Sequence, residues 1–150
     1  MKKNLLYQEA VESILSRVQN LQVHNPPLWG QMNATEMLLH VNLCNQEIFD
    51  ATAPARRTTF KQYLLRIIAL YIAPNFKKGI KGDIKKETVG RIAETEFDKQ
   101  KAQFIELTKR FPQHKSSITL PHIAFGNIST NEWGIALYKH IDHHLRQFGV

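Results

Sequence analysis

Apolar residues recur every three or four positions along most of the chain, the spacing that places them on one face of an α-helix. No segment shows the sustained alternation of apolar and polar residues that is typical of a half-buried strand. The pattern predicts five helices, over about residues 5–21, 33–50, 59–73, 95–111 and 129–149.

Three of the predicted helices begin with a capping box, in which Ser, Thr or Asn is followed three residues later by an acidic residue. The pairs are Asn33 with Glu36, Thr95 with Asp98, and Ser129 with Glu132. Glycine and proline mark two long irregular connections, residues 74–94 and 113–128. Five helices joined in this way predict an all-α bundle in one domain over residues 1–150.

The composition is that of one ordinary globular domain, with 150 residues of which 43% are hydrophobic and 22% charged. Cys44 is the only cysteine, so no disulfide can form within the chain, which suits a reducing compartment. The longest apolar segment, residues 64–73, contains Arg66 and has about half the length of a membrane span. We therefore predict a soluble cytoplasmic protein that does not enter a membrane.

The formal net charge of +7 raises the alternative that the chain binds a nucleic acid or a membrane surface. Residues 74–94 carry five lysines and one arginine against three acidic residues. Phe76 is the only aromatic residue among them, whereas nucleic-acid sites interleave stacking aromatics with basic residues. We therefore expect a solvated basic loop, and a nonspecific nucleic-acid-binding module is the weaker alternative.

Histidine carries the clearest chemical signal, because His140 and His144 stand one turn apart in the last predicted helix. At about 100° per residue, both lie on the same side as Leu137 and Ile141, which is the apolar face. Two imidazoles at positions i and i+4 of such a face form a chelating pair for a metal ion. The alternative is that each ring packs in the core and bonds to a neighbouring polar group.

A third ligand is expected from the second predicted helix, where His40 lies beside the apolar stripe that contains Met37 and Val41. We predict that His40, His140 and His144 bind one divalent metal ion. Three histidines leave a coordination position open for water or substrate, as in catalytic zinc sites. Histidine ligands alone do not select among zinc, nickel, iron and copper.

Five further residues are candidates to line or support this site: Cys44, Trp29, Trp133, His143 and Gln147. Cys44 follows His40 by one turn and could approach the metal or act as a nucleophile, although a small buried core residue is the simpler interpretation. Gln147 could hydrogen-bond a ligand ring. The two tryptophans could wall a pocket or pack as plain core.

Three other polar residues are expected to face solvent. His122 lies in the predicted connection before the last helix, where facing the metal site is the alternative to solvation. Asp142 and Arg146 lie on the polar side of that helix. The sequence predicts no catalytic group besides the metal.

The segment from Tyr138 to Gly149, YKHIDHHLRQFG, resembles the last helix of the DinB-like (damage-inducible) superfamily of four-helix-bundle metalloproteins, and within it a branch of small bacterial proteins. Supporting motifs are LWGQM at 28–32, MLLH at 37–40, AFG at 124–126 and EW at 132–133. The resemblance implies a four-helix bundle with an additional short helix and long connections. It also implies metal ligation by one histidine of the second helix and two of the last, here His40, His140 and His144.

Characterised members of the superfamily include transferases that use thiols such as bacillithiol or mycothiol, and a glutathione- or mycothiol-dependent isomerase. The resemblance therefore implies a metal-dependent enzyme, a thiol S-transferase or hydrolase-like protein, acting on a small electrophile. Its cofactors would be one zinc, nickel or iron ion and a low-molecular-weight thiol, whose pKa the metal would lower. A homodimer is also implied. The basic residues 77–86 could attract an anionic thiol.

Two alternatives stay open at this point. The chain could bind metal without turnover, as a stress-related protein or a sensor. It could also be a purely structural bundle in which the three histidines are packed side chains.

Overall fold

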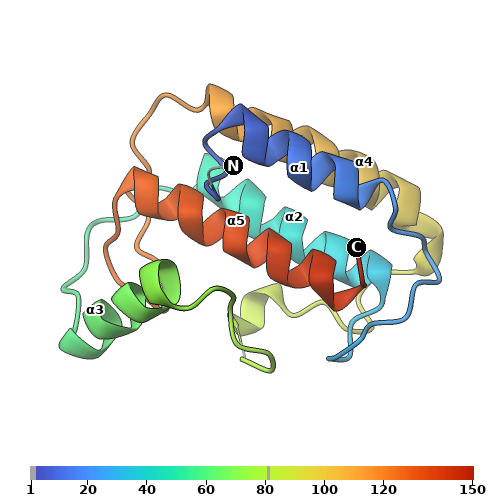
Figure 1. Cartoon of the computed structure of the whole chain (residues 1–150), viewed down its shortest axis with the longest axis horizontal. Coiled ribbons are helices and arrows are strands. Elements are labelled where there is room, and N and C mark those ends of the chain that lie inside the picture. Colours follow the sequence, from blue (N-terminus) through green and yellow to red (C-terminus); the bar gives the residue numbers. More distant parts are fainter. Residues whose placement is uncertain (1–2, 81) are drawn as a thin grey trace.

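Four helices pack side by side in the computed structural model, which describes residues 3–80 and 82–150 (Figure 1). They are α1 (Gln8–Val18), α2 (Ala34–Asp50), α4 (Phe97–Arg110) and α5 (Thr130–Gln147). Helix α1 contacts α4 and α5, and α2 contacts the same two helices, so the four form a ring with α1 and α2 on one diagonal. Helices α1 and α5 run in one direction, and α2 and α4 run in the other (Figure 1).

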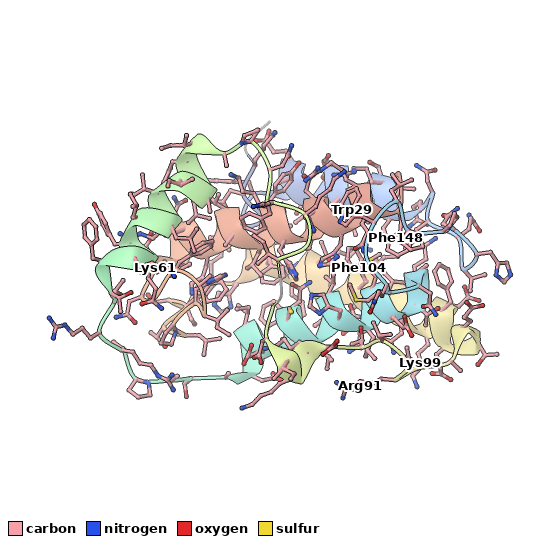
Figure 2. The ribbon with its side chains drawn as sticks, turned by 90° about the horizontal axis from the view of Figure 1, so that it is seen from below. Trp29, Lys61, Arg91, Lys99, Phe104 and Phe148 are labelled. Carbon is pink, nitrogen blue, oxygen red and sulfur yellow. The ribbon has the colours of Figure 1, made fainter. Side chains whose placement is uncertain are left out.

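Each of the four helices contributes one apolar stripe to a shared core, as the periodicity predicts. Phe104 of α4 has no exposed surface and lies between the helices (Figure 2). The side chains that are completely buried around it come from all four helices and include Val11, Ile14, Met37, Val41, Ile141 and Leu145. The prediction of an all-α bundle is confirmed.

The fifth helix, α3 (Phe60–Ile67), lies outside the ring beside the first turns of α5 and continues as a π-helix over Ile68–Ile72 (Figure 1). Shorter 3-10 turns cover Ile84–Lys86, Glu94–Glu96 and Phe111–Gln113. The described residues contain no strand, only an isolated bridge between residues 122 and 126. No helix among them is both long and apolar enough to span a bilayer.

No residue of α3 itself is buried, and the segment is attached to the bundle by polar contacts and by Leu70 of the π-helix, which is buried in the core. The Lys139 ammonium donates to the main-chain carbonyls of Ala69 and Ala73, each at 2.6 Å, and so satisfies groups that the π-helix leaves free. The Arg66 guanidinium lies 3.4 Å from the Glu132 carboxylate at the start of α5.

The predicted capping boxes at Asn33 and Ser129 are present, and a third at Thr59 was not predicted. The predicted box at Thr95 is wrong, because that residue lies inside the 3-10 turn that precedes α4 and Glu96 occupies the N-cap without a side-chain bond. Competition from this tighter turn moves the start of the helix.

Helix α1 is shorter than predicted, because Leu5 and Leu21 are buried in turns on either side of it and not in the helix. The Leu5 amide donates to the Gly134 carbonyl of α5 at 2.9 Å. A Cβ at Gly134 would lie 2.0 Å from the Asn4 side-chain oxygen, so this glycine allows the N-terminal segment to reach α5. Apolar periodicity located the core residues but not the helix ends.

Glu132 both caps α5 and connects it to α3, and we expect Glu132→Ala to destabilise the fold by about 0.5–2 kcal/mol at neutral pH. Burial opposes ionisation of Glu132, but hydrogen bonds from Ser129 and the Arg66 charge lower its pKa overall. Its contribution is therefore present above the ordinary pKa of glutamate and is lost as the pH falls through the lowered folded value. Urea unfolding at neutral and acidic pH measures this, with the exposed Glu106→Ala as control. An equal decrease in the free energy of unfolding for Glu132→Ala and Glu106→Ala would contradict the capping role of Glu132.

Candidate metal centre

The three histidines predicted as metal ligands meet where α2 and α5 face each other. The Nε2 atom of His140 lies 3.1 Å from that of His40 and 3.2 Å from that of His144. The centroids of the three rings are 4.8 to 5.2 Å apart. Helices α2 and α5 are adjacent and antiparallel, so one turn of α2 can place His40 opposite the pair on α5.

The spacing of these nitrogens fits a shared ion. Zinc–imidazole bonds measure about 2.0–2.1 Å, so two ligands of a tetrahedral zinc ion stand roughly 3.3 Å apart. The two separations at His140 are close to that value.

The second nitrogen of His40 is held by the main chain. Its Nδ1 lies 2.8 Å from the Lys86 carbonyl oxygen, which can only accept, so Nδ1 carries the hydrogen. A neutral His40 ring therefore has its lone pair on Nε2, facing His140. Burial lowers the His40 pKa and keeps the ring neutral at physiological pH; the hydrogen bond to the Lys86 carbonyl opposes this shift, and the Lys86 charge adds to it.

The second nitrogen of His144 is held in the same way by a side chain. His144 Nδ1 lies 2.9 Å from Gln147 Oε1, and Gln147 Nε2 donates to the Trp29 carbonyl at 2.7 Å, which fixes the amide orientation. His144 therefore also directs a lone pair from Nε2 toward His140. Gly30, at φ 80°, leaves room for this amide, because a Cβ there would lie 2.6 Å from Gln147 Nε2.

These two tautomers leave the cluster with more lone pairs than hydrogens. His140 Nε2 can offer one hydrogen at most, but the lone pairs of both His40 and His144 point at it. Burial and the neighbouring rings lower the pKa of His140 well below its usual value, and burial lowers that of His144 to about 3, so protonation does not supply the missing hydrogen. Three ring nitrogens that converge with at most one hydrogen among them are an arrangement that a cation satisfies.

Cys44 also belongs to this cluster. Its Sγ lies 4.0 Å from His40 Nε2, and the donor atoms of His40, Cys44 and His140 all lie within 4.8 Å of one another. This group of three could hold a metal ion. Burial raises the pKa of Cys44 to about 12, so the side chain is a thiol in the absence of a metal. His40, Cys44 and His140 are half-buried, whereas His144 is buried.

Trp29 and His143 form a wall beside His144. The rings of His143 and Trp29 are in edge contact with centroids 5.5 Å apart, and His143 makes a similar contact with His144. The hydrogen bond from Gln147 to its carbonyl places Trp29 at the C-terminal end of α5, and Figure 2 labels it. The Lys78 ammonium stands 4.1 Å from the centre of the Trp29 ring, which brings one cation of the basic loop to this wall.

His122 is not the solvated loop residue that was expected. Its ring stacks on Phe125 with centroids 4.1 Å apart and contacts the buried Trp133 at 5.0 Å. Burial lowers its pKa to about 4, and it is close enough to His140 to contribute to the lowered pKa there. Trp133 is buried and donates from Nε1 to the Leu120 carbonyl, so it is a core residue. Its ring contacts His122.

Two further surface assignments are wrong. Asp142 is half-buried and accepts hydrogen bonds from Arg17 of α1 at 2.7 Å and from Arg146 at 2.9 Å, because α1 covers this side of α5. Lys86, in the basic loop, is also half-buried and pairs with Glu47. The rest of the described loop is mostly exposed, as expected, and Lys81 lies outside the described residues.

Comparison with known families connects the whole chain to one group of proteins. The family model that matches, over residues 1–149, is described as a protein of unknown function (DUF1569). The chain belongs to the DUF1569 family. No curated protein and no solved structure matches it. The matched range of the DUF1569 model includes all three histidines and Cys44.

Two supports of the cluster in this DUF1569 chain were not found by sequence reasoning. The Lys86 carbonyl, which orients His40, comes from a segment 46 positions along the chain. The sequence gives no signal for this contact, because every residue has a main-chain carbonyl. His122 could have been found, because its neighbours Phe125 and Trp133 provide an apolar surface on which a ring can stack.

Proposed function

We propose that the chain is a metal-dependent enzyme of the DinB-like superfamily, in which His40, His140 and His144 hold one zinc, nickel or iron ion. In this proposal a low-molecular-weight thiol reacts with a small electrophile at that ion. The observation that carries the proposal is the convergence of three imidazole nitrogens, with two Nε2 separations of 3.1 and 3.2 Å and at most one hydrogen among them. The DUF1569 match over residues 1–149 and the all-α bundle also support it.

When bound, a divalent ion supplies Lewis-acid chemistry, which lowers the pKa of a thiol or a water molecule and makes it a nucleophile at neutral pH. The protein fixes the direction of the ligands, because the Lys86 carbonyl and the Gln147 amide hold the rings of His40 and His144. The ring of His122 contacts the buried Trp133, and the ring of His143 contacts His144, so both pack beside the cluster.

Lys78 is positioned to attract an anionic thiol, since it lies over Trp29 beside the cluster. We expect Lys78→Gln to raise the KM for the thiol by a few-fold at low ionic strength and to have little effect at high salt, with kcat unchanged. Steady-state kinetics at two salt concentrations test this, with the exposed Lys109→Gln as control. A KM that does not change in Lys78→Gln would remove the steering role.

Cobalt spectroscopy separates the two ligand sets that the geometry offers. If the three histidines bind the ion without Cys44, Co²⁺-loaded wild type has no sulfur-to-cobalt charge-transfer band, and Cys44→Ser has the same spectrum. Added thiol should then produce such a band in both proteins. A band present before thiol is added and absent from Cys44→Ser would show instead that Cys44 is a ligand, together with His40 and His140.

Turnover is tested directly by assaying the zinc-loaded protein with several low-molecular-weight thiols and a chromogenic aryl halide as the electrophile. The proposal predicts a rate above the uncatalysed reaction that is lost on chelation and in His140→Ala. A protein that retains its ion but gives only the uncatalysed rate across the panel would be a metal-binding protein without turnover.

A further inference from the structure

Helix α3 and the π-helix that follows it present an apolar face to solvent. Six large side chains on this face are between 43% and 81% exposed, and we call them the α3 face: Phe60, Tyr63, Leu64, Ile68, Tyr71 and Ile72. No residue of α3 itself is buried. A contiguous exposed apolar surface of this kind marks a site of contact with a partner or a membrane.

The surroundings of the α3 face are basic. Residues 51–82 contain seven of the 20 lysines and arginines and none of the 13 acidic residues, so the rest of the chain has equal numbers of basic and acidic residues. The excess positive charge of the chain therefore belongs to the segment that contains α3. Arg56, Arg57 and Lys61 in this segment are exposed, and Lys61 projects from α3 itself, well away from the core residue Phe104 (Figure 2). Lys78 lies over Trp29 and not beside α3.

The mode of attachment leaves this face free. Helix α3 contacts α5 through Arg66. The π-helix does so through main-chain carbonyls that Lys139 holds, through the Tyr71 hydroxyl, which donates to Glu132 at 3.2 Å, and through Leu70, which is buried in the core. The four-helix ring lies on one side of α3 (Figure 1), and Phe60, Leu64 and Ile68 are between 43% and 81% exposed. Contact with a flat surface there would not disturb the ring or the histidine cluster.

The charge decides which occupant fits. A second copy would bring another acid-free basic segment against the first, and like charges across an interface oppose association. Four of the six side chains in the α3 face are aliphatic or phenyl groups without hydrogen-bonding capacity, which suits lipid better than nucleic-acid bases. An anionic bilayer offers both an apolar interior for Leu64 and Ile68 and negative headgroups for the flanking cations. Tyr63 and Tyr71 are residues that favour the level of the headgroups.

We propose that the chain binds the surface of anionic phospholipid membranes through the α3 face, with α3 and the π-helix lying in the plane of the headgroups. This goes beyond the proposed metal chemistry and does not rest on it. The sequence alone leads us to expect a solvated basic loop at 74–94 and no membrane contact. The proposal differs from that expectation because the exposed α3 face is visible only in the folded structure. The homodimer that the family resemblance implies stays a prediction. If the α3 face binds a membrane, such a dimer would form through another surface of the chain.

Vesicle co-sedimentation of the whole chain tests the proposal. Wild type should sediment with vesicles of phosphatidylcholine that contain one quarter phosphatidylglycerol, should stay in solution with pure phosphatidylcholine, and should be released as salt is raised. Two variants should each lose at least tenfold in binding. One carries Leu64→Ser, Ile68→Ser and Ile72→Ser, and the other carries Arg56→Gln, Arg57→Gln and Lys61→Gln.

Matched control variants change the same residue types elsewhere. Leu28→Ser with Ile84→Ser removes two exposed apolar side chains outside the α3 face, and Lys99→Gln, Lys109→Gln and Lys115→Gln together remove three exposed charges. Both controls should bind vesicles as wild type does, and circular dichroism should show that every variant folds, since the replaced side chains are exposed. Equal binding by the α3-face variants and the controls would overturn the proposal, as would wild type that ignores anionic vesicles. A dimer in analytical ultracentrifugation that the apolar variant alone loses would assign the face to a second copy and would also overturn it.

Discussion

Zinc added to the metal-free protein is expected to raise the free energy of unfolding by about 4 kcal/mol when free zinc exceeds its Kd about a thousandfold. The rise corresponds to an increase in Tm of roughly 8–16 °C for a domain of this size. The physical reason is that the folded chain holds the Nε2 atoms of three imidazoles close together, whereas the unfolded chain does not. Thermal unfolding with a chelator and with zinc measures the change.

The variants His140→Ala and His144→Ala should lose nearly all of this zinc-dependent rise. Each variant is compared with itself, with and without zinc, so any loss of packing from the truncated ring cancels. His24→Ala is the matched control, because the His24 side chain is 84% exposed and lies away from the cluster. A zinc effect of the same size in His140→Ala as in wild type would show that the ion stabilises the protein from some other place.

Phe104→Ala is expected to destabilise the fold by about 3–5 kcal/mol, whether or not a metal is present. Phe104 has no exposed surface, and it lies between the helices of the ring, so its removal leaves a cavity that surrounding side chains fill only in part (Figure 2). Urea unfolding of the metal-free protein gives the change in free energy. A domain of this size has a total stability of about 5–15 kcal/mol, so the variant keeps only a fraction of it.

Phe60→Ala provides the comparison, because it removes the same side chain from a position that is 81% exposed. We expect its effect to stay within about 0.5 kcal/mol, as for most surface substitutions. Similar losses for the two phenylalanines would mean that α3 packs against the ring in solution. That result would also remove the exposed α3 face on which membrane binding depends.

The sequence was sufficient to predict the architecture, because each helix of the ring has a continuous apolar stripe and two of them carry complete capping boxes. The ends of the helices were less predictable. Leu5 and Leu21 fit the periodicity of the first helix, but turns place them in the core without extending it. At Thr95 a 3-10 turn takes the place of the predicted cap. Periodicity reports which residues are buried, and only local hydrogen bonds fix where a helix stops.

The meeting of His40 with His140 and His144 was predictable for a related reason. Positions on the apolar faces of adjacent helices must point into the same interior, so polar residues placed there come close to one another. Their supports were harder to foresee. Gln147 lies one turn after His144 and could be named from helix geometry, whereas the Lys86 carbonyl comes from an irregular loop. The exposed face of α3 was not predictable at all, because an apolar helix in a sequence is ordinarily read as part of a core.

Metal content is the most direct test of the central claim. The protein should be purified without a histidine tag and analysed by elemental mass spectrometry beside the double variant His140→Ala/His144→Ala, with circular dichroism to show that both fold. The account predicts about one divalent ion per chain in wild type and none in the double variant. Wild type that contains no metal and fails to take up added zinc, nickel or iron would contradict it, and the three histidines would then be side chains of a structural core.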